Sequence, residues 1–257
     1  MPVLLPVSML VFIPTYNERN NVERTCSQLL ALQPSANSAL PAFDILFVDD
    51  NSPDGTGAAL DQLAKQHANV RVIHRPGKLG IGSAHRIGIA YAYDHSYETL
   101  VTMDCDGTHP PEYLPQLFAK ARESDVVVGS RYLNKDSLNE WTLFRRLLTY
   151  GGHALTTTLL GMPYDASSAY RLYRLDAIPR RLFELIHSPG YAFFFESLYV
   201  LNLNQFRIAE VGILLPARAS GQSKMTMSEA WRGLTRLGRM CLSIALRRQR
   251  YLLRNIP

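Results

Sequence analysis

Apolar segments alternate with amphipathic segments along the first half of the chain. Five segments have the pattern of strands: four are mostly apolar, as in strands buried on both faces of a sheet, and the third, residues 69–75, alternates. They are residues 7–14, 43–50, 69–75, 98–104 and 124–131. Between them, apolar residues recur at helical spacing over residues 18–32, 56–67, 79–95 and 111–123. This alternation predicts an α/β fold with a mainly parallel, Rossmann-like sheet and helices on both of its faces.

The second half of the chain continues with longer helices. Helices are predicted over residues 143–164 and 191–203, and strands over residues 168–175 and 206–217. Residues 228–253 combine apolar and basic side chains, which predicts a basic amphipathic C-terminal helix. The sequence contains no internal repeat and no low-complexity linker. We therefore expect one domain over residues 1–225 and the amphipathic helix within residues 226–257.

Polar and charged residues, together with one proline, mark the end of each predicted strand in the first half. They are Pro14, Tyr16 and Glu18, then Asp50, then Arg75 and Lys78, then Asp104 and Asp106, and finally Arg131. Each one alone is explained by a solvated loop or a helix cap. Ligands of parallel α/β sheets, however, bind at the carboxyl ends of the strands. Five such strand ends together indicate one binding site on this edge of the sheet.

Asp104 and Asp106 are the most informative of these residues. Side chains two positions apart on an extended segment point the same way, so both carboxylates can face one point. Their mutual repulsion is relieved by a cation or a proton. Few, solvent-open oxygen ligands suit Mg²⁺ or Mn²⁺ held partly by a substrate diphosphate. A surface turn at Asp106-Gly107 is the alternative, and the position at a strand end favours the metal.

A glycine-rich stretch, "RPGKLGIGSAHRIG", raises the question of dinucleotide binding. It contains Gly80 and Gly82, but His85 stands where the dinucleotide fingerprint requires glycine. The sequence also lacks the GxxxxGK[ST] pattern of a P-loop. Both of these phosphate-binding motifs are therefore excluded, although Arg75 and Lys78 can still contact a ligand.

Composition limits the cellular setting. The three cysteines are scattered and form no CxxC pair, which argues against a disulfide framework or a cysteine zinc site and suits a reducing compartment. The apolar N-terminus has no basic region and no cleavage site, so we expect a first strand and no signal peptide. No run of about 18 apolar residues occurs, which predicts no transmembrane span.

The net charge of +5 is unevenly distributed. From Arg218 to the C-terminus there are nine Lys or Arg residues and one acid, Glu229, which gives +8 and leaves −3 for the rest. A basic tail indicates an anionic partner: nucleic acid, a lipid surface or a phosphorylated substrate. Because the charge lies on one apolar-backed helix and no nucleic-acid-binding motif is present, we expect no nucleic acid partner.

Eight motifs occur in the order found in family 2 glycosyltransferases, from about Pro6 to Lys224. They are "FIPTYNE", "VDDNSPDGTG", "RPGKLGIGSAHRIGIAYA", "MDCDGTHPPEYLP", "VVVGSRY", "DASSAYRLYR", "GYAFFFE" and "RASGQSK". The chain resembles most the branch of dolichyl-phosphate, or polyprenyl-phosphate, mannosyltransferases. This resemblance implies a GT-A catalytic domain over residues 1–225, a nucleotide-sugar donor such as GDP-mannose, Mg²⁺ or Mn²⁺, and inverting transfer to a polyprenyl phosphate.

The resemblance also implies roles for individual residues. The nucleotide-sugar site would comprise Pro14, Tyr16, Glu18, Val48, Asp50, Asp104, Cys105, Asp106, Arg131, Arg218 and Lys224. Within it, Asp104 and Asp106 would hold the metal, and Cys105 replaces the alanine usual between them. "WTLFRRLLT" is similar to a family motif that meets the lipid phosphate, which would place Arg145 and Thr149 there beside Arg131.

A phosphate acceptor changes what the catalytic residues must do. A phosphate monoester is already ionised near neutral pH, so its positioning by Arg131 and Arg145 matters more than a general base. A lipid acceptor gives the basic tail helix a use, with apolar side chains in the headgroup boundary and arginines on anionic lipid. We therefore expect a peripheral protein on the cytoplasmic face of a membrane. A helix packed on the domain, with a solvated arginine face, is the alternative.

Two further functions stay open from the sequence. One is a related family 2 transferase that uses UDP-glucose or UDP-N-acetylglucosamine, with a lipid phosphate or another acceptor. The other is a non-catalytic protein that only binds nucleotide sugars. The presence of Asp104, Asp106, Arg131 and Arg218 argues against a protein that has lost its catalytic residues.

Overall fold

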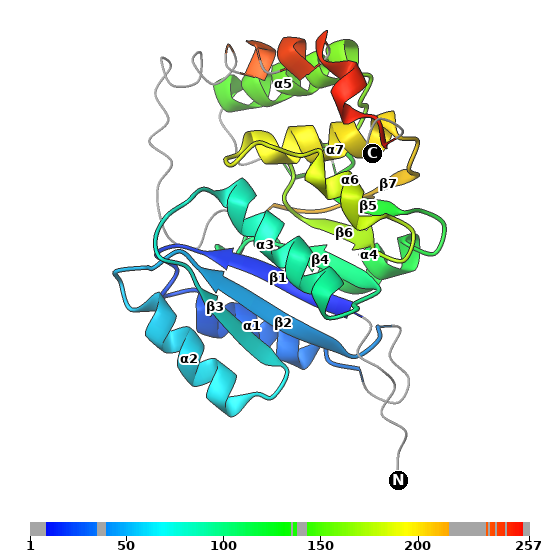
Figure 1. The fold of residues 1–257 in the computed structure, drawn as a ribbon. Coiled ribbons are helices and arrows are strands. Elements are labelled where there is room, and N and C mark those ends of the chain that lie inside the picture. Colours follow the sequence, from blue (N-terminus) through cyan, green and yellow to red (C-terminus); the bar gives the residue numbers. More distant parts are fainter. Residues whose placement is uncertain are drawn as a thin grey trace.

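A single mixed sheet forms the centre of the protein (Figure 1). The computed structural model describes residues 9–34, 40–134, 136–137, 143–215, 235, 237–239, 241–244 and 246–253. Within them the sheet has seven strands in the order β3-β2-β1-β4-β6-β5-β7. The strands are β1 Met9–Thr15, β2 Phe43–Asp49, β3 Val70–His74, β4 Thr99–Thr102, β5 Val126–Ser130, β6 Arg171–Arg174 and β7 Ile208–Gly212. Only β6 runs antiparallel to its neighbours, β4 and β5, so the predicted mainly parallel sheet is confirmed.

Alternate residues of the central strand enter two separate cores. In β1, Met9, Val11 and Ile13 pack into one apolar cluster, while Leu10 and Phe12 pack into the other. All five side chains are completely buried. This explains why residues 9–13 are all apolar in the sequence: both faces of the sheet are covered by helices.

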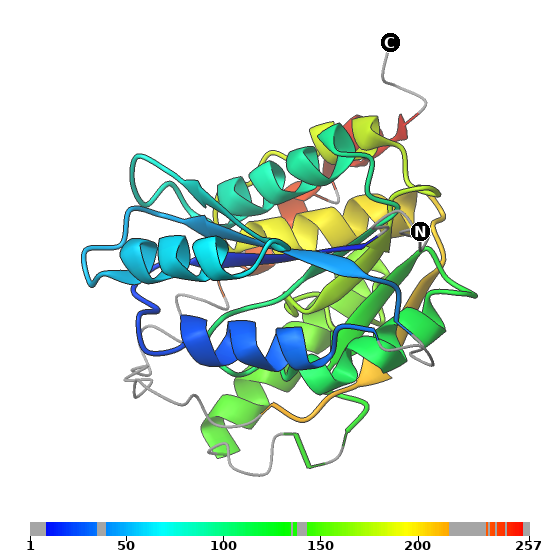
Figure 2. The same ribbon diagram turned by 90° about the horizontal axis from the view of Figure 1, so that it is seen from below.

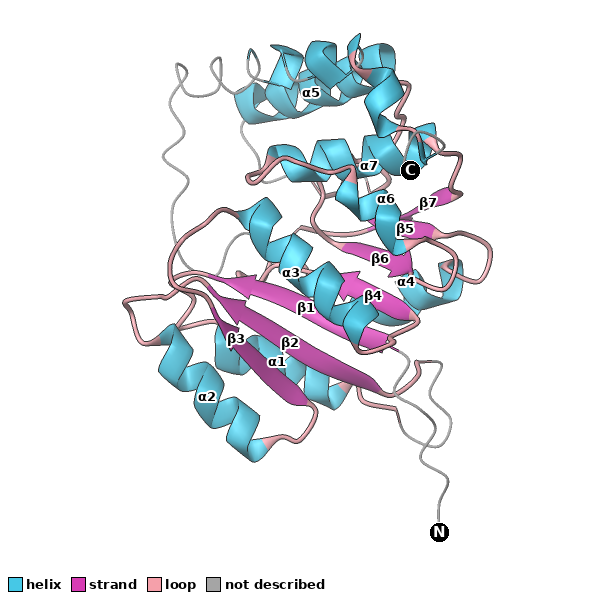
Figure 3. Cartoon of the chain, in the orientation of Figure 1, coloured by secondary structure: helices cyan, strands magenta, loops and turns pink. Residues whose placement is uncertain are grey.

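The helices lie in layers on the two faces of the sheet (Figures 1 and 2). They are α1 Val22–Ala31, α2 Thr56–Gln66, α3 Ile81–Asp94, α4 Leu114–Lys120, α5 Leu143–Leu160, α6 Arg180–Glu184 and α7 Ala192–Leu203. Buried residues of α1, α2 and α4 belong to one core cluster, and those of α3, α6 and α7 to the other. Figure 3 shows α5 as an additional layer outside α7.

The C-terminal segment, which we define as the described part of residues 235–253, packs against the outer helix α5. Leu237 lies beside Gly152, and Leu155 lies beside Gly238, so small residues let the two helices approach closely. Cys241 is fully buried. Within the described part of the chain, no helix is both long and apolar enough to cross a membrane.

Three details differ from the predicted elements. The predicted helix 111–123 divides into a 3₁₀ turn, η1 Pro111–Tyr113, and α4, because Pro115 lacks an N–H and suits the first turn of a new helix. Helix α6 was missed, since five residues are too few to show a period. The last helix gives way to the 3₁₀ turn η2, Arg248–Tyr251, before residue 253. The predicted boundary at residue 225 lies outside the described residues.

Candidate active site

A cleft of about 350 Å³ opens at the carboxyl ends of β1, β2 and β4. It is the edge of the sheet at which the sequence predicted a ligand site. The predicted nucleotide-sugar residues that line it are Pro14, Tyr16, Glu18, Asp50, Asp104, Cys105 and Asp106. Residues from three strand ends that are distant in the sequence are therefore brought together in one cleft.

The backbone after β4 turns the two carboxylates toward the cleft and the cysteine away from it. Cys105 is 2% exposed, and its carbonyl accepts a hydrogen bond from the Thr25 hydroxyl of α1 at 3.3 Å. Asp106 Oδ1 accepts two hydrogen bonds from Thr108, from the hydroxyl at 2.6 Å and from the backbone N–H at 3.0 Å. Burial raises the pKa of Cys105 to about 12, so its thiol stays protonated and is a poor metal ligand.

His109 fixes the backbone of this turn through a side-chain hydrogen bond. Its Nδ1 accepts the backbone N–H of Asp104 at 2.8 Å, which places the imidazole proton on Nε2. The ring is buried and stacks on Tyr170, with 5.2 Å between centroids. Burial lowers the pKa of His109, against the opposing effect of Asp104 and Asp106. A neutral, immobilised imidazole therefore orients the first carboxylate of the pair.

The donor atoms of this turn fit a divalent cation that shares its ligands with a substrate. Among the described residues, no group of three or more His, Cys, Asp or Glu side chains is arranged to hold a metal. Asp104 and Asp106 supply two carboxylates on the cleft, and the Asp104 side chain is 37% exposed. Mg²⁺ and Mn²⁺ take such oxygen ligands and retain places for phosphate oxygens and water.

The opposite wall of the cleft carries a buried ion pair. Arg75 Nη1 lies 2.8 Å from Asp50 Oδ1, and both side chains are less than a tenth exposed. Burial raises the pKa of Asp50, while the charge of Arg75 opposes that rise. Asp50 Oδ1 has no aligned hydrogen-bond donor among the described residues, and a ligand hydroxyl or base N–H can supply one. At the rim, Lys78 Nζ lies 4.1 Å from the Tyr16 ring centroid, a cation–π contact.

A loop from the second half of the chain completes the cleft. Loop 187–190 leads into α7, and Gly190, Tyr191 and Phe194 line the cavity. The Glu196 carboxylate accepts the backbone N–H groups of His187 at 3.1 Å and Ser188 at 2.7 Å. This carboxylate therefore fixes the backbone of the loop.

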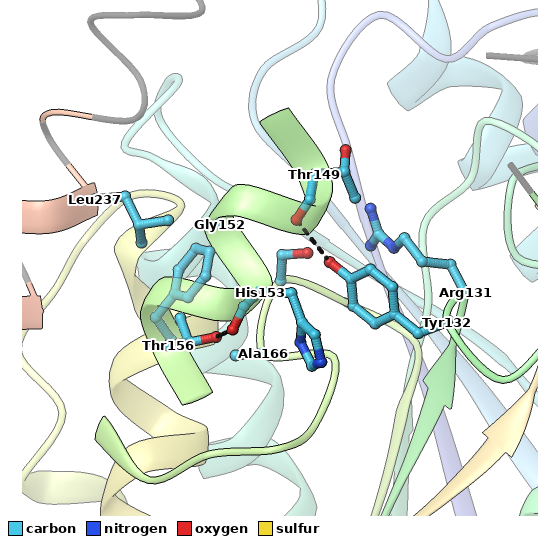
Figure 4. Close-up of a pocket in the computed structure, with 10 residues that line it drawn as sticks. Arg131, Tyr132, Thr149, Gly152, His153, Thr156, Ala166 and Leu237 are labelled. Carbon is cyan, nitrogen blue, oxygen red and sulfur yellow. Dashed lines mark hydrogen bonds between the residues drawn. The ribbon is translucent and has the colours of Figure 1, made fainter. Parts of the chain in front are cut away.

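A second pocket of about 160 Å³ lies between the end of β5 and α5 (Figure 4). Arg131 and Thr149, two of the predicted acceptor residues, both line it. The Tyr132 hydroxyl donates to the Thr149 carbonyl at 3.3 Å. The His153 ring stacks on Tyr132, with 4.2 Å between centroids. Leu237 of the C-terminal segment also lines this pocket, so the tail contributes to the site.

Arg131 is held in place by an acid that is buried completely. Its Nε donates to Asp165 Oδ2 at 2.7 Å, and its backbone N–H donates to the same oxygen at 3.2 Å. Asp165 in turn donates its backbone N–H to Glu210 of β7 at 2.7 Å. The charges of Arg131 and Asp165 affect the pKa of His109, as those of Asp104 and Asp106 do. His109 is therefore within electrostatic reach of charged residues at both pockets.

Some predicted site residues are not on these cavities. Val48 is fully buried in the core and is not among the residues that line the cleft. Arg145 lies in α5, but its side chain is outside the described part, and so are Arg218 and Lys224. Tyr191 lines the cleft but was not predicted as a site residue, although the motif "GYAFFFE" contains it.

The chain belongs to glycosyltransferase family 2. The model of that family, "Glycosyl transferase family 2", matches residues 10–182. Among curated relatives, an undecaprenyl-phosphate mannosyltransferase of Micrococcus luteus is 36% identical over 90% of this chain and 93% of its own. A polyprenol monophosphomannose synthase of Mycolicibacterium smegmatis is 36% identical over 85% of this chain and 81% of its own.

Solved structures share the fold at lower identity. Glucosyl-3-phosphoglycerate synthase from Mycobacterium tuberculosis, solved with Mn²⁺, UDP and glucosyl-3-phosphoglycerate, has a TM-score of 0.59 and 20% identity, covering 98% of this chain and 81% of that one. A mannosyltransferase from Pyrobaculum calidifontis, solved with GDP-Man and Mn²⁺, has a TM-score of 0.59 and 17% identity. The match covers 93% of this chain and 64% of that one. The predicted GT-A fold is therefore confirmed.

Proposed function

We propose that this protein transfers mannose from GDP-mannose to a polyprenyl phosphate, with inversion at the sugar and with Mg²⁺ or Mn²⁺. Two relatives that are each 36% identical have names that describe mannosyl transfer to undecaprenyl phosphate and polyprenol monophosphomannose synthesis. The observation that carries the proposal is the placement of two cavities at the same edge of the sheet, where β4 and β5 end. One has a carboxylate pair for a metal–diphosphate, and the other has Arg131 beside α5 for an acceptor phosphate.

On the donor side, charge develops on the leaving diphosphate as the glycosidic bond breaks. Asp104 and Asp106 would hold the cation, which neutralises that charge when bound. Asp50 and Tyr16 line the same cleft and would receive the nucleoside, and Lys78 at its rim adds positive charge. Arg218 and Lys224 remain assigned to the diphosphate by the family motif alone.

On the acceptor side, the attacking group is an ionised phosphate oxygen. It carries no proton at neutral pH, so no general base is required for attack on the anomeric carbon. Arg131 would fix the phosphate, because Asp165 orients its guanidinium at the pocket and leaves further N–H donors. Thr149 would contribute a hydroxyl, and the family motif adds Arg145. Catalysis would then rest on positioning and on charge stabilisation of the leaving group.

The acceptor's lipid chain requires access from a membrane surface. Helix α5 exposes Leu143, Leu147 and Tyr150 at 73%, 63% and 52%, at spacings that place them on one face. Leu242 and Leu246 of the neighbouring C-terminal segment are 55% and 79% exposed. Exposed large apolar side chains grouped in this way are typical of a surface that meets lipid. We propose peripheral binding at the cytoplasmic face through these two helices.

The test is transfer of labelled sugar from GDP-mannose, UDP-glucose or UDP-N-acetylglucosamine into an extractable polyprenyl phosphate. Each donor is assayed with Mg²⁺ or Mn²⁺, with EDTA, and with Asp106→Asn as the variant. Metal-dependent mannose label in the lipid, reduced at least about a hundredfold in the variant, supports the proposal. Label from a UDP-sugar alone would overturn the assignment of GDP-mannose as the donor. Donor hydrolysis without lipid label would overturn the assignment of polyprenyl phosphate as the acceptor. Donor binding without turnover would overturn the enzymatic function.

A further inference from the structure

A third cavity is lined by the first two residues of loop 187–190, whereas the last residue of that loop lines the donor cleft. It measures about 330 Å³ and is formed where the C-terminal segment meets this loop. His187 and Ser188 line it from the loop, and Ser243, Arg247 and Arg250 line it from the C-terminal segment. None of these residues has a role in the proposed transfer reaction.

The cavity carries a net positive charge, from two arginines against one acid. Arg247 and Arg250 are both exposed, and among the described residues neither forms an ion pair with a carboxylate. Glu196 is the one acid that lines the cavity, but it is 3% exposed and already accepts three hydrogen bonds. Those come from the backbone N–H groups of His187 and Ser188 and from the Tyr251 hydroxyl. The acid is therefore occupied within the protein, whereas the guanidinium groups retain donors for a ligand.

We propose that this cavity binds the phosphate of an anionic phospholipid headgroup. Guanidinium groups bind phosphate oxygens through paired hydrogen bonds, and hydroxyl groups satisfy the remaining oxygens. Arg247 and Arg250 supply the charge, and Ser243 and Ser188 supply the hydroxyl groups. Ser243, Arg247 and Arg250 all line the cavity, although the chain passes from α-helix to the 3₁₀ turn η2 between the first and the last of them.

A lipid is favoured over free phosphate because apolar side chains flank the basic ones. Leu242 and Leu246 immediately precede Ser243 and Arg247, and both leucines are more than half exposed. A segment that presents leucines beside arginines matches the boundary between acyl chains and headgroups. Each arginine near an anionic membrane surface strengthens binding about fivefold. Headgroup binding here would dock this end of the protein independently of the acceptor lipid.

The test measures binding of the full-length protein to vesicles, with no donor or acceptor present. Vesicles of phosphatidylcholine alone are compared with vesicles that also contain phosphatidylglycerol, by co-sedimentation. The pocket variant is R247Q/R250Q, and the matched control is R239Q/R248Q. The control removes the same charge from exposed positions of the same segment that do not line the cavity. All four arginines are exposed, so both variants should keep the wild-type unfolding midpoint.

The control removes two surface charges and should lose at most about thirtyfold in affinity for phosphatidylglycerol vesicles, and we expect the pocket variant to lose at least about tenfold more than the control. Equal losses in both variants would instead indicate a diffuse basic surface and overturn the pocket. Wild-type binding that does not depend on phosphatidylglycerol would overturn the proposal that the cavity binds an anionic headgroup. Inorganic phosphate that displaces the protein from vesicles at concentrations comparable to the lipid would make free phosphate the ligand. Because the assay involves no sugar transfer, its failure is distinct from failure of the proposed function.

Discussion

At the scale of single residues, the buried ion pair of Arg75 with Asp50 controls one wall of the donor cleft. Both side chains are less than a tenth exposed, and Arg75 also donates to Ser83 at 2.5 Å. Removing one partner would leave the other charge buried without compensation. We expect Arg75→Ala to lower the free energy of unfolding by about 3 to 5 kcal/mol, measured by urea denaturation.

An exposed ion pair on the same protein provides the control for this effect. Arg19 and Glu23 are 2.9 Å apart on the surface of α1 and its preceding turn, with side chains 44% and 63% exposed. Arg19→Ala should cost less than about 1 kcal/mol, because water screens this pair. In addition, the double replacement Asp50→Asn with Arg75→Ala should cost less than the two single losses added together. Additive single losses would show that the pair does not act as a unit.

His85 provides a pH-dependent term in stability. It is 1% exposed, lies against the rings of Phe12, Phe193 and Phe194, and contacts the Ile81 carbonyl through Nδ1 at 3.0 Å. Burial lowers the pKa of His85 from 6.5 to about 4. Between these values the unfolded chain binds a proton that the folded chain does not. The free energy of unfolding therefore falls as pH drops through this window, by about 3 kcal/mol from this residue.

The contribution of His85 is isolated by comparison with His85→Phe. Other groups, including carboxylates, also titrate at low pH, so the informative quantity is the difference between the two stability curves. The wild-type free energy of unfolding minus that of the variant should be constant above pH 7 and should decrease as pH falls from 6.5 toward 4. Curves that stay parallel over the whole range would mean that His85 does not resist protonation in the folded state.

At the scale of elements, the start of α3 and loop 187–190 depend on each other. A methyl group on Gly82 would lie 2.5 Å from the Ser188 carbonyl oxygen and 2.7 Å from Phe193 Cβ. Backbone would have to move, because the close atoms are not at the end of a flexible side chain. Gly82→Ala should lower the free energy of unfolding by about 1 to 3 kcal/mol. It should also weaken nucleotide binding, measured by calorimetry, because the loop leads to residues that line the cleft.

Gly77 is the matched control for this substitution. It lies in the loop before α3, five residues ahead of Gly82, and a methyl group there would meet nothing within 4 Å. Gly77→Ala should therefore leave both stability and nucleotide affinity within about 0.5 kcal/mol of wild type. If Gly82→Ala behaves like Gly77→Ala, the loop does not depend on close packing against α3.

The elements also show which features a sequence can predict. The strands and most helices were predicted because their periodicity is local, and Asp50, Asp104 and Asp106 met at one edge because parallel strands end together. The antiparallel insertion of β6 between β4 and β5 was not predicted, since the order of strands depends on contacts between distant segments. The same holds for Glu196, whose carboxylate fixes loop 187–190 and the Tyr251 hydroxyl, 55 residues further along the chain.

At the scale of the whole molecule, the two cavities and the exposed leucines belong to one arrangement. Helix α5 contributes Thr149 to the acceptor pocket from one side and exposes Leu147 from another. In the C-terminal segment, Leu237 likewise lines the acceptor pocket and Leu246 is exposed. A polyprenyl phosphate could therefore place its phosphate in the pocket while its chain stays in the bilayer beside these helices. This requires the two helices to meet the membrane together.

That requirement predicts the effect of charges on the lipid-facing side. Leu147→Asp with Leu246→Asp should weaken binding to neutral phosphatidylcholine vesicles at least about tenfold, because each buried leucine contributes 1.5 kcal/mol or more. Transfer to a short-chain, water-soluble acceptor phosphate should stay near the wild-type rate, since neither leucine lines the donor cleft or the acceptor pocket. Leu133→Asp is the control, as Leu133 is 58% exposed but lies outside both helices. Equal loss of activity on soluble and vesicle-borne acceptors would show that the substitutions damage the catalytic site rather than docking at the membrane.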